Sequence, residues 1–203
     1  MLLIGPATEH EMVLAFLKAE IDSPRYEQVY QQKLSALGFS RTQLIESADL
    51  HDDQQNVERI KLLGEVRGYG VNSYLFHGFP NDVVWQRVRL DQPELERLKY
   101  AKHQAWITLS KATRLVRDGA RNIDTIQVRD PVGGTVNGNI KAVAVAVKNG
   151  QNYPELIAVS GSGNDLILVE GHTRATAYVL SGYNQPVSLL VGSSSRMTHW
   201  AFY

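Results

Sequence analysis

Five adjacent residues in the last fifth of the chain combine the side chains that phosphate chemistry uses. Glu170-Gly171-His172-Thr173-Arg174 places an acid, a histidine, a hydroxyl and an arginine around one glycine. A carboxylate can ligate Mg²⁺ or accept a proton from a hydroxyl group. Arginine presents a planar fork that can grip two phosphate oxygens. These residue types make the stretch our candidate functional site.

The segments on either side predict the elements that hold this stretch. Residues 166–169 (Leu-Ile-Leu-Val) are typical of a buried strand, and an alanine-rich helix is expected from about Thr173 to Leu180. A strand that turns into a helix through a glycine leaves the first helical N–H groups pointing outward, where the helix dipole favours an anion. An alternative stays open: Thr173 or His172 caps the helix, and Arg174 only pairs with an acid.

Composition limits the classes of function. The chain has 203 residues, and its 21 Lys and Arg balance 21 Asp and Glu, so no overall basic field exists to hold a nucleic-acid backbone. It contains no cysteine, which excludes disulfides, thiolate catalysis and cysteine zinc sites. The opening MLLIG is too short for a signal peptide or a membrane span. We therefore expect a cytoplasmic protein with no membrane partner.

The first 80 residues are expected to form a helical lobe. A capping box at Thr8–Glu11 opens the first helix, and Gly38 and Gly64 are the expected ends of later ones. The pattern is all-helical up to about residue 68. We find no chemistry in this lobe and assign it no role.

Residues 81–203 are expected to form a second domain with strands and helices. A capping box at Asp91–Glu94 starts a helix, and residues 131–134 form a loop. Residues 83–90, 154–160 and 186–192 are predicted strands. Asn139–Lys148 is ambiguous, because KAVAVAV alternates like a strand while its apolar residues also fit one helix face.

Four further residues could reach a nucleotide. Trp85 and Trp106 could stack on a base, although tryptophans at strand and helix positions are more often core residues. Arg114 and Arg117 could contact a phosphate, but a solvated helix face is the commoner place for such a pair.

The order of elements from residue 140 onward, together with the corner at Glu170–Arg174, resembles the ParB/sulfiredoxin superfamily. The corner is closest to the D-G-H-T-R motif of ParB-like free serine kinases, and Ala175 and Ala177-Tyr178 are similar to its continuation. The resemblance is clearest over residues 138–203 and implies a helix for Asn139–Lys148. The expected class is thus α+β: a helical lobe (1–80) followed by a small ParB/sulfiredoxin-like mixed-sheet domain (81–203).

This resemblance implies a bound nucleotide, ATP, ADP or CTP, together with Mg²⁺. Gly171 would let the backbone approach a phosphate, and His172, Thr173 and Arg174 would contact phosphate oxygens or the metal. Glu170 would be the metal ligand or the base, and His172 a second catalytic residue. The implied reaction is Mg-dependent nucleotide hydrolysis or phosphotransfer to a small hydroxyl acceptor.

The chain departs from the kinase pattern in two respects. Glu170 stands where the kinases have aspartate, which moves the carboxylate by about one methylene, and errors near 1 Å can cost ~100-fold in rate. The kinases also use a separate upstream glutamate, for which Glu94 is our candidate. Sulfiredoxin chemistry requires a cysteine at this corner and is excluded.

Two alternative functions remain. One is a DNA-associated partition-like or nuclease-like protein that a nucleotide switches. The neutral charge balance argues against it, as do the roughly 20 residues after the motif helix, too few for a separate DNA reader. The other is a non-catalytic module whose helical lobe binds a protein partner.

Overall fold

A mixed sheet forms the centre of the computed structural model, which describes residues 1–130 and 134–203. The strand order is β1-β2-β5-β3-β4; β3 and β5 run parallel, and the other neighbours are antiparallel. The strands are β1 (Leu2–Ala7), β2 (Val84–Leu90), β3 (Leu156–Ser160), β4 (Ile167–Glu170) and β5 (Val187–Ser193). The class is α+β, as predicted. The first three residues of the loop predicted at 131–134 lie outside the described residues.

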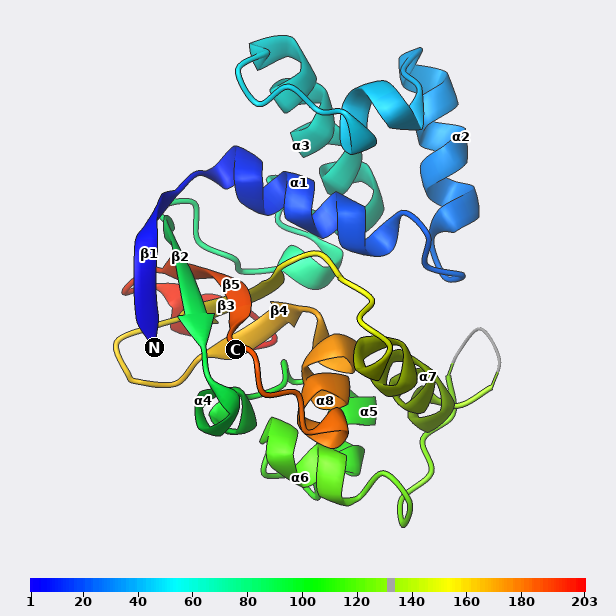
Figure 1. Ribbon diagram of the computed structural model, residues 1–203. Helices are drawn as coiled ribbons and strands as arrows, with labels where there is room; N and C mark the ends of the chain where they lie inside the picture. Colours follow the sequence, from blue (N-terminus) through cyan, green and yellow to red (C-terminus); the bar gives the residue numbers. More distant parts are fainter. Residues whose placement is uncertain (131–133) are drawn as a thin grey trace.

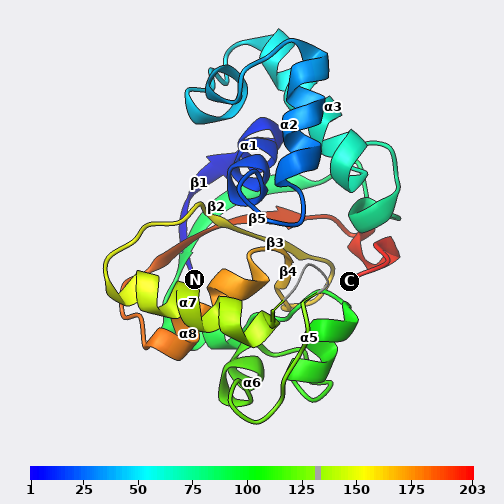
Figure 2. The same cartoon turned by 90° about the vertical axis from the view of Figure 1, so that its right-hand side faces the viewer.

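Helices cover both faces of the sheet (Figure 1). Helix α1 lies over one face, with α2 and α3 stacked beyond it, while α4 to α8 lie on the other side; the turned view in Figure 2 shows the same layers. The helices are α1 (Glu9–Glu20), α2 (Glu27–Leu37), α3 (Asp53–Arg67), α4 (Gln92–Arg97), α5 (Gln104–Leu109), α6 (Val116–Arg121), α7 (Val136–Lys148) and α8 (His172–Ser181). Shorter helical turns are η1 (Thr42–Glu46), η2 (Tyr74–Phe76) and η3 (Met197–His199).

The all-helical prediction for the first 68 residues is wrong at its start. Leu2–Ala7 forms the edge strand β1, which pairs with β2. This strand is exposed at three successive apolar residues, Leu2, Leu3 and Ile4. It therefore lacks the alternation of apolar and polar residues by which a half-buried strand is predicted from sequence. Its partner also lies about 80 residues further along the chain. The first residues of the predicted lobe therefore belong to the sheet.

The lobe and the sheet share one hydrophobic core cluster. Met12, Val13 and Phe16 of α1 belong to the same buried cluster as Ile157 and Leu190 of the sheet. A second cluster on the opposite face joins Leu156, Ala158 and Leu189 to Ala175 of α8. Because β3 contributes to both clusters at alternate positions, the sheet is buried on both faces.

The segments around the motif agree with the sequence prediction. The ambiguous segment is the helix α7, and the predicted strands at 154–160, 166–169 and 186–192 correspond to β3, β4 and β5. The predicted capping boxes at Thr8–Glu11 and Asp91–Glu94 are both present.

Gly64 does not end its helix, contrary to prediction. Helix α3 continues to Arg67 and ends at Gly68, whose φ of +88° is the left-handed conformation typical of a C-cap. A Cβ at Gly64 would lie 2.7 Å from the carbonyl oxygen of Tyr69. Glycine is therefore needed at position 64 so that Tyr69 can pack against α3. Because the helix continues past Gly64, Arg67 becomes its last residue.

Candidate functional site

The corner between β4 and α8 depends on Gly171. Strand β4 ends at Glu170, Gly171 has a φ of +99°, and α8 begins at His172. A Cβ at Gly171 would lie 2.4 Å from Leu156 Cδ2, so glycine is required by both conformation and space. Gly171 is the N-cap, and no side chain of the described residues caps the helix. The alternative in which Thr173 or His172 caps α8 is thus wrong, and the positive end of the helix dipole is uncapped.

Arg174 and Glu170 are ion-paired to each other across one turn. Arg174 also donates to the carbonyl oxygens of Pro154 and Glu155, and the side chain is buried. The pairing of Arg174 with an acid, one part of the alternative reading, is therefore present. A phosphate that takes this guanidinium must compete with Glu170, and its arrival would release that carboxylate.

His172 is a buried, neutral hydrogen-bond donor. The Ala101 N–H donates to His172 Nε2 at 3.2 Å, so the remaining proton is assigned to Nδ1. Burial lowers the pKa of His172 well below its ordinary value, and the nearby cations act in the same direction. His172 Nδ1 has no hydrogen-bond partner among the described residues, and the side chain lines a pocket. This geometry suits a fixed hydrogen-bond donor to a phosphate oxygen, one of the contacts predicted for His172, better than it suits proton transfer.

Aromatic rings fix the orientation of the His172 ring. Trp106 of α5 stacks on it with centroids 5.3 Å apart, and Tyr100 lies nearly parallel at 6.0 Å. His103 meets it edge-on at 6.0 Å, and burial lowers the pKa of His103 to about 4. Trp106 thus orients the His172 ring and also lines the pocket described below, whereas Trp85 is buried in the core.

A pocket of about 670 Å³ opens over this corner, and all five residues from Glu170 to Arg174 line it. Its other walls include the end of α1, the α1–α2 connection, Arg67 at the end of α3, the α5 region with His103 and Trp106, the first half of α7 and residues 151–154. Thr173 lies half-buried in its wall. The lobe, in which the sequence showed no candidate chemistry, forms one side of this pocket.

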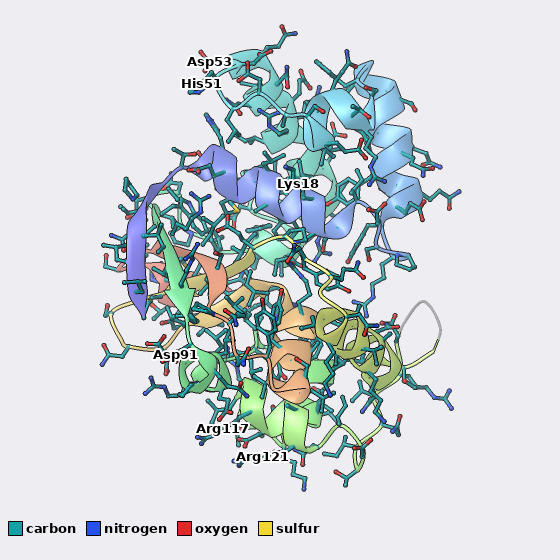
Figure 3. All side chains as sticks on the ribbon, viewed as in Figure 1. Lys18, His51, Asp53, Asp91, Arg117 and Arg121 are labelled. Carbon is teal, nitrogen blue, oxygen red and sulfur yellow. The ribbon has the colours of Figure 1, made fainter. Side chains whose placement is uncertain are left out.

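Charges in this pocket are balanced and mostly paired. The basic residues lining it are Lys18, Arg25, Arg67 and Arg174, and the acidic ones are Glu20, Asp22, Asp130 and Glu170. Each of the three arginines pairs with one of these acids: Arg25 with Asp130 at 2.6 Å, Arg67 with Glu20 at 3.3 Å, and Arg174 with Glu170. Within the described ranges Lys18, labelled on α1 in Figure 3, has no acidic partner.

Glu20 is the acid that the sequence prediction missed. It ends the apolar face of α1, one turn after Phe16, and is buried. Tyr30 Oη donates to Glu20 Oε2 at 3.1 Å. Burial raises the pKa of Glu20 to about 7, aided by the negative charge of Glu170 and opposed by Arg67 and Tyr30. A carboxylate at helical spacing within an apolar stripe is the signal that could have revealed it.

Glu94 lies away from the other candidates. Its carboxylate accepts from the Asp91 N–H in the capping box and also contacts the amino group of Met1. It does not line the corner pocket. Arg114 and Arg117 are absent from that lining too: Arg114 holds the carbonyl oxygens of Tyr100 and Tyr203, and Arg117 lies beside Asp118.

The side chains of the corner pocket could hold a metal ion only together with oxygen atoms from a bound nucleotide or from water. Among residues 1–130 and 134–203, no group of three or more His, Asp or Glu side chains could hold a metal ion. Mg²⁺ is commonly held by one or two carboxylates together with substrate phosphates and water. Glu170 fits that arrangement once Arg174 has moved to a phosphate.

Comparison with family models, with curated proteins and with solved structures found no match. In the described part of the chain, no helix is both long enough and apolar enough to span a membrane.

Proposed function

We propose that the corner pocket binds a nucleotide, with its phosphates at the start of α8. The observation that carries this proposal is the convergence of the uncapped α8 N-terminus, the buried His172 donor and three arginines in one pocket. Helix N-termini and arginine forks are the two protein groups best suited to phosphate. The volume of about 670 Å³ lies within the range of small-molecule sites. The resemblance of the corner to ParB-like kinases supports the same ligand class.

The phosphates would be held by three kinds of donor. The first amide groups of α8 would face one phosphate, because no side chain of the described residues caps them. His172 would donate from Nδ1, and neutrality lets it do so without gaining or losing a proton near neutral pH. Arg174 would exchange Glu170 for phosphate oxygens, a charge-assisted bond of about twice the neutral strength.

We propose further that this site hydrolyses the nucleotide or transfers its terminal phosphoryl group to a small hydroxyl acceptor. The acceptor oxygen would form a bond to phosphorus as the bond to the leaving phosphate oxygen breaks. The released Glu170 carboxylate would take the hydroxyl proton or hold the cation. When bound, Mg²⁺ would neutralise charge on the phosphate oxygens. Trp106 and Tyr100 support this reaction indirectly, since they keep the His172 donor fixed.

Calorimetry with ATP, ADP, CTP and GTP, with and without Mg²⁺, tests this proposal. We expect the wild type to bind at least one of them and Arg174→Gln to weaken that affinity about ten-fold or more, since a bond to a charged group contributes about 1.5–3 kcal/mol. Thr173→Val, in the half-buried pocket wall, is the milder variant if Arg174→Gln folds poorly. Arg196→Gln is the matched control, because Arg196 is exposed, pairs with Asp82 and lines a different cavity.

No binding of any nucleotide by the wild type would refute the proposal. Phosphate transferred to a hydroxyl compound would identify a kinase, and free phosphate a hydrolase. Salt-sensitive DNA binding that a nucleotide strengthens would select the partition-like alternative instead.

A further inference from the structure

The helical lobe contributes to the corner pocket through two contacting side chains. Arg67 ends α3, and its Nε lies 3.3 Å from Glu20 Oε2 at the end of α1. The same guanidinium lies 4.4 Å from the centroid of the Tyr26 ring and contacts the Tyr26 hydroxyl. Both Arg67 and Glu20 line the same pocket as the corner residues.

Arg67 pairs with Glu20, and its position in the pocket would also let it contact a bound ligand. Its positive charge lies close enough to the corner to lower the pKa of His172, the first residue of α8. It also lowers the pKa of His103, the residue just before α5. Its side chain is 17% exposed, so it is partly screened from water yet open to the pocket. A charged hydrogen bond in such surroundings is stronger than one on the open surface.

Moving Arg67 to an anion would leave Glu20 in an unfavourable position. Glu20 is buried, and the groups that face it are Tyr30 of α2, Arg67 of α3, Arg25 of the α1–α2 connection and Glu170 of the corner. No hydrogen bond or ion pair joins Glu20 to Glu170 in the described part of the chain. A buried carboxylate that loses its cation and gains a neighbouring polyanion is destabilised by both changes, and protonation relieves both.

We infer that Arg67 and Glu20 form a proton-coupled exchange site, in which a bound polyphosphate takes Arg67 from Glu20 and Glu20 takes up a proton. This inference deepens the proposed function and rests on it. It gives the lobe a role at the same site: Arg67 is a second anion-binding arginine, and Glu20 keeps the pocket electrically balanced. The protonation requires little work near neutral pH, because the pKa of Glu20 already lies at about 7.

Calorimetry with inorganic pyrophosphate, repeated in buffers of different ionisation enthalpy, tests the inference. At pH 7 we expect the wild type to take up about half a proton more per bound pyrophosphate than Glu20→Gln does, because a group with its pKa near the working pH is half ionised before binding. The difference between these two proteins removes the protons that pyrophosphate itself exchanges. Glu20→Gln keeps an oxygen for Tyr30 and should bind at least as tightly as the wild type.

Arg67→Met should weaken pyrophosphate binding about ten-fold or more. Arg67→Lys, which keeps the charge but not the fork, is the second variant if Arg67→Met folds poorly, and it should lose several-fold. Arg121→Met is the control: Arg121 is exposed on α6, at the end of the molecule farthest from the lobe in Figure 3. It should bind like the wild type.

The outcomes separate this inference from the proposed function. If a nucleotide binds but the Arg67 variants bind pyrophosphate as tightly as the wild type, the exchange site is refuted and the nucleotide site stands. Equal proton uptake by wild type and Glu20→Gln also refutes it. If pyrophosphate binds with the expected pattern and no nucleotide does, the exchange site stands and the nucleotide proposal falls. If the wild type does not bind pyrophosphate, the inference is overturned.

Discussion

At Gly171 the backbone conformation and the surrounding packing both require glycine. Its φ of +99° strains any residue with a side chain, and a Cβ there would lie 2.4 Å from Leu156 in the core. We expect Gly171→Ala to lower the free energy of unfolding by about 2–4 kcal/mol, through backbone strain and overpacking together. Urea titration measures this loss.

Gly182→Ala is the matched control for Gly171→Ala. Gly182 ends the same helix with a φ of +66°, but a Cβ there would meet nothing within 4 Å. It therefore tests backbone strain without the clash, and we expect a loss of about 1 kcal/mol. Equal losses in the two variants would contradict the role assigned to the contact with Leu156.

Glu20 should make stability depend on pH. Its pKa rises from 4.5 to about 7 on folding, so the folded state binds the proton more tightly than the unfolded state. The stability that this gives is fully present below pH 4.5 and is lost as pH rises through about 7. Relative to Glu20→Gln, the wild type should lose about 3 kcal/mol between these limits, at 1.36 kcal/mol for each pH unit. Urea titration of both proteins from pH 5 to pH 8 checks this.

A control separates burial from simple loss of charge. Glu27→Gln removes a charge from the exposed face of α2, and its stability should follow that of the wild type across the same pH range. If the difference between wild type and Glu20→Gln stayed constant from pH 5 to pH 8, the assignment of Glu20 would be wrong.

Sequence alone predicted the elements that are built from local signals. The corner, α7, α8 and the two capping boxes are specified by glycines, caps and apolar spacing within a few residues. The five corner residues were also predicted to act together, and they do line one pocket. The sequence also left open a pairing of Arg174 with an acid, and the structure shows Glu170 as its partner.

The elements and residues that sequence missed depend on distant partners. β1 is a strand because β2 lies beside it, and Gly64 is a glycine because Tyr69 folds back against α3. Arg67 and Glu20 enter the pocket because the lobe packs over the sheet. None of these relations is encoded within one stretch of sequence, so Glu20 and Arg67 were not among the predicted site residues.

The whole molecule should unfold as one cooperative unit. A single buried cluster includes residues of α1, α3 and the sheet, so the lobe has no separate core among the described residues. We expect far-UV circular dichroism, which reports the helices of the lobe and of the sheet side together, to give the same urea midpoint as tryptophan fluorescence. Trp85 and Trp200 belong to this shared cluster, so fluorescence reports directly on the contact between lobe and sheet.

Phe16→Ala tests whether the lobe and the sheet unfold cooperatively, because Phe16 lies in their shared cluster. Phe16 is fully buried on α1 within the shared cluster, so its truncation should cost about 3–5 kcal/mol and shift both probes by the same amount. Val57→Ala on α3, where the side chain is 61% exposed, should shift neither probe by more than about 0.5 kcal/mol. Two separate transitions, or a shift in circular dichroism alone, would show that the lobe unfolds independently. An independent lobe could not hold Arg67 and Glu20 against the corner, so the coincidence of these midpoints also bears on the architecture of the pocket.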